Sequence, residues 1–256
     1  MPPRLPLSAL VLAGALASCG APSASVTPFI ASVGINGELS IAQSMGSENI
    51  KTTFKDLGLD ENEAAVGGIL RVGFGGTELS VSGYGVDFQG QGRVTGEFNF
   101  EGITIPAGAD VATDLGIQMA RAMVTWDVIP LGALDLGLGI GATVVDFDVK
   151  LQEIGGPNRI ETDQLIPIPL LAARLAWTWG PVEMRADVGG LGIRYEGVEA
   201  AMIDAGINAS VDFFGIGDLV VGFKTMRVDA QYEDDDADID TDFDLEGFYA
   251  GLRLGF

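Results

Sequence analysis

The chain has 256 residues, with 14 basic side chains, 36 acidic side chains and no histidine, so its formal net charge is −22 at pH 7. This charge excludes a nucleic-acid binder, because binding to phosphates requires clustered Lys and Arg. The lack of histidine excludes chemistry that depends on an imidazole. The length allows one large domain or two small ones, with 47% hydrophobic residues to build a core.

Residues 1–18 predict a secretory signal peptide. Arg4 supplies the positive start, and an apolar stretch that is too short to cross a bilayer follows up to Ala17. The one cysteine, Cys19, ends a Leu-Ala-Ser-Cys tetrad that resembles a bacterial lipobox and implies lipidation at Cys19. Cleavage after Ala17, with Cys19 incidental, is the alternative. Both interpretations predict export from the cytoplasm.

After a short N-terminal segment at 19–28, residues 29–256 alternate with the period of two that is typical of β-strands. Residues 201–213 show this best, because every second residue from Ala201 to Phe213 is apolar and the residues between them are mostly polar or small. The pattern predicts ten strands, with eight as the alternative. They are expected near residues 29–42, 65–75, 78–88, 113–128, 133–149, 164–178, 182–195, 199–213, 218–232 and 241–256.

Short turns and long loops alternate along the chain. Gly- and Pro-containing turns follow every second strand, at 75–77, 130–132, 180–181 and 215–217. Most other connections are long and polar, at 43–64, 89–112, 150–163 and 233–240, and residues 54–62 of the first could form a helical turn. Short turns at one end and long loops at the other indicate an all-β fold. We predict a single antiparallel up-and-down transmembrane β-barrel.

Alternation alone does not say which face points inward, so a soluble or lipid-anchored, lipocalin-like carrier of an apolar ligand is the alternative. The polar face favours the membrane barrel, since it combines glycines and isolated arginines with nearby carboxylates, and the chain has only four lysines. The polar network expected in the lumen consists of Arg71, Arg121, Asp127, Arg174, Glu183, Arg185, Asp187, Asp212 and Arg253. Two functions are open to it: a plug of ion pairs, or a narrow path for solutes with charged walls.

The aromatic residues fall into two bands, as expected for girdles on either side of an apolar belt, although strand ends also gather aromatics as core plugs. The band at the short-turn end comprises Phe29, Phe74, Trp126, Trp177, Trp179, Phe213 and Phe256. The band toward the loops comprises Tyr84, Phe88, Phe147, Tyr195, Tyr232 and Phe243.

The last ten residues, GFYAGLRLGF, end on Phe256 with apolar residues at alternate positions. This segment resembles the C-terminal strand of small Gram-negative outer-membrane β-barrel proteins, which the barrel-insertion machinery recognises. The resemblance implies a location in the cell outer membrane, with its lipids and that machinery as partners and no soluble state. It implies no oligomeric state.

The known small outer-membrane enzymes, namely phospholipases, lipid A deacylases, palmitoyltransferases and omptin proteases, use a histidine, which this chain lacks. We therefore expect no enzyme. The expected function is a structural or surface-exposed barrel, with a narrow passive channel for small solutes as a further option.

The densest charge lies between Glu233 and Glu246, where nine of fourteen residues are acidic. Oxygen ligands suit Ca²⁺ or Mg²⁺, but an EF-hand register starting at the first Asp places Ile239 where glycine is required. The segment is expected to be a solvated loop whose self-repulsion discourages sheet pairing, or else to bridge divalent cations to lipid phosphates. No cofactor is expected beyond loosely bound divalent cations. Their candidate ligands are Asp234, Asp236, Asp238 and Asp240.

Overall fold

The computed structural model describes residues 22–43, 50–59, 61–96, 98–100, 103–131, 133–195, 198–234 and 237–256. Within these residues every regular element is a β-strand. This part of the chain contains no helix that is long and apolar enough to span a bilayer. The signal peptide and Cys19 lie outside it.

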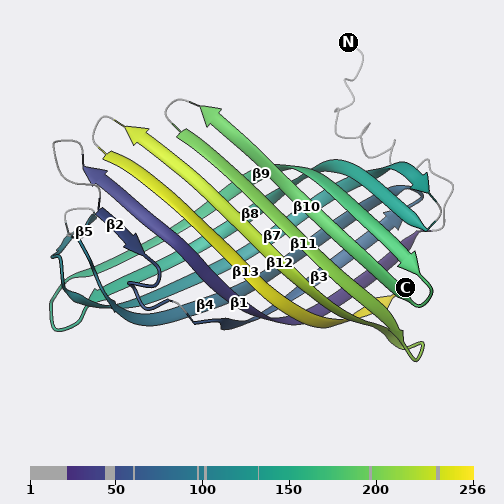
Figure 1. Cartoon of the computed structure of the whole chain (residues 1–256), viewed down its shortest axis with the longest axis horizontal. Coiled ribbons are helices and arrows are strands. Elements are labelled where there is room, and N and C mark those ends of the chain that lie inside the picture. Colours follow the sequence, from purple (N-terminus) through teal and green to yellow (C-terminus); the bar gives the residue numbers. More distant parts are fainter. Residues whose placement is uncertain are drawn as a thin grey trace, which may run out of the picture.

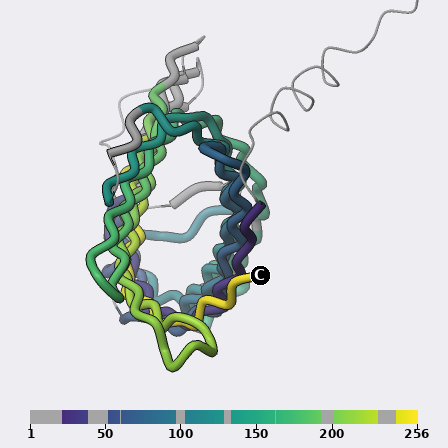
Figure 2. Tube along the Cα trace, turned by 90° about the vertical axis from the view of Figure 1, so that its right-hand side faces the viewer, coloured from purple at the N-terminus to yellow at the C-terminus, as the bar shows by residue number. Residues whose placement is uncertain are grey.

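Ten long antiparallel strands form a closed barrel within the described residues, because β13 pairs with β1 (Figures 1 and 2). They are β1 (Ser23–Gln43), β3 (Glu63–Phe74), β4 (Thr77–Arg93), β7 (Asp110–Leu131), β8 (Leu134–Glu153), β9 (Arg159–Trp179), β10 (Val182–Tyr195), β11 (Val198–Phe213), β12 (Gly217–Asp234) and β13 (Ala237–Gly255). The short strand β2 (Ile50–Thr53) pairs with β1, and β5 (Phe98–Phe100) pairs with β6 (Ile103–Ile105). The predicted ten-stranded barrel is confirmed, although β1 begins at Ser23, before the predicted start at residue 29.

The barrel has two different ends. At the short-turn end, on the right of Figure 1, tight turns connect β3 to β4, β7 to β8, β9 to β10 and β11 to β12. The last of these turns uses left-handed backbone at Phe214 (φ 55°) and Gly215 (φ 72°). The longer connections lie at the opposite end, called the loop end below.

The acidic segment is a hairpin rather than a polar loop. Glu233 pairs with Asp238, and Asp234 pairs with Ala237, so β12 and β13 continue almost to residues 235–236, which lie outside the described part. The expectation that charge repulsion discourages pairing here was wrong. The β12–β13 ladder runs from Asp218–Arg253 to Asp234–Ala237 without a break, so the main-chain hydrogen bonds of the two strands continue through the acidic residues.

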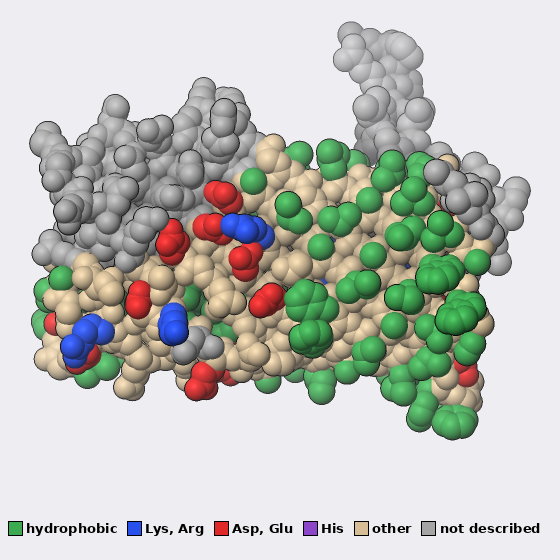
Figure 3. Space-filling view, viewed as in Figure 1, with side chains coloured by type: hydrophobic (Ala, Val, Ile, Leu, Met, Phe, Trp, Pro, Cys, Tyr) green, Lys and Arg blue, Asp and Glu red, His purple; other side chains and the backbone are tan. Residues whose placement is uncertain are grey.

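The outer surface near the short-turn end is apolar. On β11 the row that includes Ile203 and Ile207 is half exposed, whereas Met202 and Asp204 of the alternate row are buried. Figure 3 shows hydrophobic side chains covering this half of the surface, while charged side chains gather toward the loop end. The aliphatic row therefore points outward, which is opposite to the direction that a carrier with an apolar cavity requires.

The polarity of both faces reverses along the barrel. Toward the loop end the inner rows are apolar and pack across the lumen as one cluster, which we call the apolar plug. It consists of Val33, Ile35, Leu59, Ala65, Val86, Phe88, Leu115, Ile117, Met119, Val145, Leu170, Met202, Met226, Phe243 and Leu245. At the same level the outer rows carry exposed polar residues such as Asp87 and Asp114. This half of the barrel has an apolar interior and a polar outer surface.

The reversal explains why the second aromatic band was wrong. Phe88 and Phe243 belong to the apolar plug, Tyr84 and Phe147 pack against it, and the rings of Phe147 and Phe243 meet edge to face at 5.6 Å. The side chains of Tyr195 and Tyr232 lie outside the described set.

Around the short-turn end, a half-exposed or exposed outward ring does exist, and it includes Trp126, Trp177, Trp179, Phe213 and Phe256. Phe29, predicted for this ring, is buried inside against Tyr249, with ring centroids 5.0 Å apart.

The first long connection folds into the barrel at the loop end. Thr53 and Asp56 cap each other through side-chain hydrogen bonds, and the amide of Leu57 donates to the carbonyl of Thr53, which confirms the expected helical turn. This turn places Leu59 in the apolar plug. Its backbone lies directly on Gly90 of β4, where a Cβ would collide with the backbone of Gly58.

We expect Gly90→Ala to displace the turn at residues 53–59, because overpacking against backbone costs about 1–3 kcal/mol. Hydrogen exchange of the amides of Leu57 and Leu59 should then become faster. Gly85→Ala is the matched control on the same strand, since its new Cβ would lie an ordinary 3.8 Å from Gln118. Equal protection in both variants would contradict this packing.

Candidate functional site

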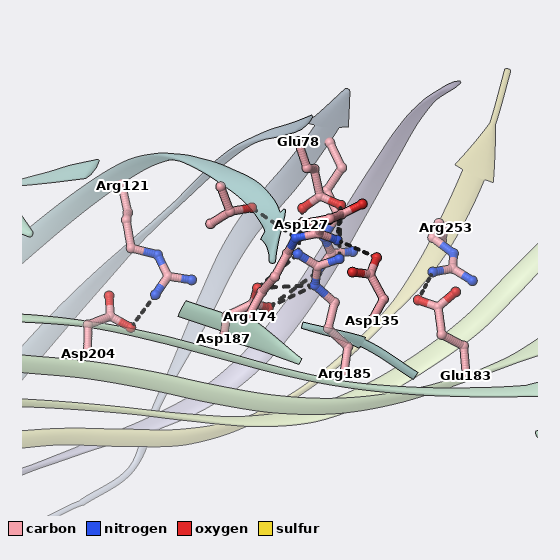
Figure 4. Close-up of polar contacts among 12 residues, drawn as sticks. Glu78, Arg121, Asp127, Asp135, Arg174, Glu183, Arg185, Asp187, Asp204 and Arg253 are labelled. Carbon is pink, nitrogen blue, oxygen red and sulfur yellow. Dashed lines mark hydrogen bonds and ion pairs between the residues drawn. The ribbon is translucent and has the colours of Figure 1, made fainter. Parts of the chain in front are cut away.

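Below the apolar plug, toward the short-turn end, the inner rows become polar and charged. We call this region the ion-pair network, and its main contacts are drawn in Figure 4. Its described members are Arg71, Glu78, Arg121, Asp127, Asp135, Arg174, Glu183, Arg185, Asp187, Asp204, Asp218, Lys224 and Arg253. Each occupies an inward position of its strand, so the period of two aims all of them into the same narrow lumen.

Arg185 of β10 is the centre of the network. Its Nη1 and Nη2 donate to the two carboxylate oxygens of Glu78 at 3.0 and 2.5 Å, which is the bidentate geometry of a strong pair. Its Nε donates to both oxygens of Asp187 at 3.1 Å. Arg71 approaches the same Asp187 at 3.9 Å. Because the side chains of Arg185 and Asp187 are 5% and 7% exposed, these charges depend on one another rather than on water.

Arg174 of β9 forms a second centre. Its Nε donates to Thr125 Oγ1 at 2.9 Å, its Nη1 donates to Asp135 at 3.1 Å, and its Nη2 donates to Asp127. Nη1 also lies 3.6 Å from Glu78, which joins this centre to that of Arg185.

The network ends below the apolar plug at Asp204 of β11, which is fully buried. Arg121 donates to Asp204 Oδ1 at 2.8 Å. The Lys224 ammonium lies 4.0 Å from Asp204 Oδ2 and 5.4 Å from the centre of the Tyr84 ring. A cation over an aromatic face is stabilised by the ring quadrupole, so Lys224 has partners on two sides.

Exposure within the network rises toward the short-turn end. The side chain of Asp204 is 0% exposed and that of Arg185 is 5% exposed, whereas Glu183 is 29% and Asp135 is 39% exposed. Arg253, near this opening, donates to Asp218 at 2.6 Å and to Glu183 at 2.7 Å. Water therefore reaches the network from the short-turn end and is excluded at Asp204.

In this arrangement the charged side chains neutralise one another. Six cationic and seven anionic side chains of the described residues pair in three groups, centred on Arg185 and Arg174, on Asp204 and on Arg253, so each buried charge faces an opposite one, as burial requires. No group of three or more Cys, Asp or Glu in the described part is arranged to hold a metal ion.

The structure brings together eight of the nine residues predicted for the lumen. Asp212 is the exception, because it is exposed at the end of β11 and accepts a hydrogen bond from the Gly215 amide at 3.1 Å. Asp212 does lie in the inward row of β11, as predicted, but it lies at the end of the strand, where the barrel wall ends. Of the metal candidates, Asp236 lies outside the described residues, and the side chains of Asp234, Asp238 and Asp240 are not described.

The sequence prediction missed several partners of the arginines. Glu78, Asp135, Asp204, Asp218 and Lys224 all belong to the network. The alternation places all five inside, since each lies an even number of residues from another buried residue of the same strand, as Glu78 does from Ser80 and Lys224 does from Met226.

Comparison with known proteins identifies a fold. No protein-family model matches the chain, and no curated protein matches it in sequence. The outer membrane protease OmpT from Escherichia coli matches with a TM-score of 0.59 and 12% identity, over 91% of this chain and 97% of that chain.

Two further matches have lower TM-scores. The translocator domain of the autotransporter NalP from Neisseria meningitidis gives 0.40 at 11% identity, over 96% and 92% of the two chains. The β domain of the Bordetella autotransporter BrkA gives 0.40 at 13% identity, over 93% and 100%. The OmpT match shows that this chain has the fold of an outer-membrane β-barrel.

Replacing Arg185 with Met should destabilise the barrel by about 3–5 kcal/mol, because it leaves Glu78 and Asp187 buried with only their longer contacts to Arg174 and Arg71, at 3.6 and 3.9 Å. Arg227→Met is the matched control, since Arg227 pairs with Asp242 at 2.7 Å but its side chain is 56% exposed. An exposed pair contributes about 0–1 kcal/mol. Urea unfolding in detergent micelles, followed by tryptophan fluorescence, measures both, and equal losses would show that the network is not a buried unit.

Proposed function

We propose that this chain is a non-catalytic outer-membrane protein: a plugged barrel that spans the bilayer with its short-turn half and holds its loop half above the membrane as an acidic, surface-exposed platform. The observation that carries this proposal is the reversal of polarity along both faces of the barrel wall.

The apolar outer rows have the length of a membrane belt. On β8 the outward apolar positions run from Leu134 to Val144, and on β11 they run from Ala201 to Phe213. About ten residues at a typical barrel tilt span about 25 Å, which is the height of the apolar band of outer-membrane barrels. The exposed rings around Trp177 and Trp179 mark the short-turn edge of this belt, as interfacial aromatics do.

Above the belt the barrel has the organisation of a water-soluble β-protein. Phe88 and Ile117 are buried inside, while Asp87 and Gln118 on the same strands are exposed outside. A surface of this kind in contact with hydrocarbon would be costly, so this half is assigned to the aqueous side. Its acids contribute to the net charge of −22, which favours a highly hydrated surface.

Three observations support a role without catalysis. The sequence has no histidine, the described arginines of the network are held by carboxylates, and the apolar plug leaves the network in contact with water from one end only. A substrate on the loop side would meet packed side chains rather than a reactive group.

The last strand supports insertion into an outer membrane. Phe248, Ala250 and Phe256 of the C-terminal segment are exposed in the outward row, with Arg253 directed inward. This presents alternate apolar side chains to lipid and to a barrel-insertion machinery.

A narrow passive channel is the second candidate, and the hydrated opening at the short-turn end favours it. The apolar plug opposes it, because an ion that leaves Asp204 would have to lose its hydration shell among Phe88, Met119 and Met226.

Ile140→Arg tests the belt, since Ile140 is 57% exposed near its middle. We expect a loss of about 2–4 kcal/mol in folding stability in phosphatidylcholine liposomes, because a cation at mid-membrane must leave water. Asp148→Arg is the control on the same outward row of β8, above the belt, and should change stability little. If both variants lose the same stability, the belt is not in lipid.

Purified native protein should insert into a planar bilayer without steady ionic conductance, because the apolar plug closes the lumen. Truncating the plug with the double variant Phe88→Ala and Met119→Ala should raise conductance above that of the native protein. Steady conductance from the native barrel would contradict a plugged lumen and favour the channel.

A further inference from the structure

The wall of the barrel is incompletely paired between β9 and β10. β9 and β10 are paired only from Trp179–Val182 to Leu171–Gly190. From Leu170 up to Arg159, β9 has a strand neighbour on its β8 side alone. The result is a seam between β9 and β10 that begins within the apolar belt and runs toward the loop end.

Two prolines explain where the seam begins. Residues 171, 169 and 167 point their backbone groups to the same side of β9, because alternate residues of a strand are equivalent. The pairing with β8 continues unbroken past Pro169 and Pro167, so their missing amide donors fall on the β10 side. The β9–β10 ladder therefore stops at Leu171, two residues from the first proline.

This edge is compatible with hydrocarbon. Backbone donors that face lipid without a partner are costly, and Pro167 and Pro169 have no donor to leave unpaired. The same absence disfavours addition of a partner strand, which would need those donors. Both prolines are exposed on the outer surface.

A groove of about 450 Å³ continues the seam toward the short-turn end, on the outer faces of β8 to β12. Ala173, Ala186 and Ala205 form its floor on three adjacent strands. Larger neighbours form its walls, since Ala186 lies between Leu175 and Ile207 in the strand register.

We propose that this groove binds one hydrocarbon chain of a membrane lipid, with the seam at Pro167 and Pro169 at its upper end. The inference rests on the proposed function, because the groove lies within the belt assigned to lipid. Its volume is within the range of sites for small apolar molecules, about 300–1,000 Å³. A narrow chain matches a concave groove better than a second copy does, since a barrel presents convex walls and a stable dimer needs about 800 Å² of matched surface from each partner.

The test uses liposomes that contain a phospholipid with a photoreactive diazirine in its acyl chain. After reconstitution of the full barrel and illumination, mass spectrometry maps the labelled peptides. We expect labelling concentrated on β9, β10 and β11.

Ala186→Phe should fill the groove and lower labelling there about tenfold, the loss that corresponds to the burial of about two methylene groups. Ala120→Phe, at an exposed outward position of β7, is the matched control and should leave labelling of the groove unchanged. Ala205→Phe repeats the test should the first variant lose the heat-modifiable gel migration of a folded barrel.

Labelling spread evenly around the belt, or unchanged by both groove variants, would overturn the lipid site. Cross-links between two copies of the chain through the groove would overturn it in favour of a dimer. A protein that fails to float with liposomes would instead contradict the proposed function itself, so the two failures are distinguishable.

Discussion

The pairing of β1 with β13 is the interaction on which the rest of the molecule depends. It runs from Ser25–Gly255 to Gln43–Ala237 and turns an antiparallel sheet into a barrel. Closure removes the outer edges of the sheet, and it also divides every strand into a row that faces a confined lumen and a row that faces the surroundings. In each half of the barrel, alternate residues of the same strands must therefore suit the lumen on one face and the exterior on the other.

The two halves solve this problem in opposite ways. In the half at the short-turn end, the apolar side chains lie on the outer face and the charged side chains lie in the lumen. These charges are tolerated there because Arg185 and Arg174 each donate hydrogen bonds to several oxygens. In the loop half the lumen takes the apolar side chains, and the charges face outward. The two interiors meet where Asp204 and Arg121 lie below Met119 and Met226, so the lumen passes from wet to dry within a short distance. Closure, burial of charge and the assignment of the membrane level are therefore parts of one arrangement.

The sequence predicted the barrel well because period-two alternation and Gly- and Pro-containing turns are local signals. It predicted the inner position of Arg174 and Arg253 for the same reason. It did not predict the reversal, which β7 illustrates. Leu115 and Ile117 are apolar and inward, whereas Ala122 and Val124 are apolar and outward, so the apolar row changes face near Met119. Alternation alone assigns every second residue of a strand to the same environment along its whole length. The second aromatic band was therefore predicted wrongly, because Phe88 and Phe243 lie on the loop side of the point where the apolar row changes face.

The identity of the ion-pair partners also lies beyond sequence reasoning, because it depends on the register between distant strands. Glu78 and Arg185 are 107 positions apart and meet across the lumen. The seam between β9 and β10 is only partly predictable from the sequence. Pro167 and Pro169 can be read there, but their effect depends on which neighbouring strand their missing amide donors would have faced. Local chemistry decides whether a strand forms, and the three-dimensional register decides what that strand does.

The central claim, that the outer face changes from water-facing to lipid-facing along one strand, is tested most directly by a spin-label scan of β7 in liposomes. Single cysteines, in a Cys19→Ser background, would carry nitroxides at outward positions 112, 114, 118, 120, 122 and 124. We expect a water-soluble nickel chelate to relax the labels at 112, 114 and 118, and oxygen dissolved in the bilayer to relax those at 120, 122 and 124. The same relaxing agent acting on all six positions would contradict it.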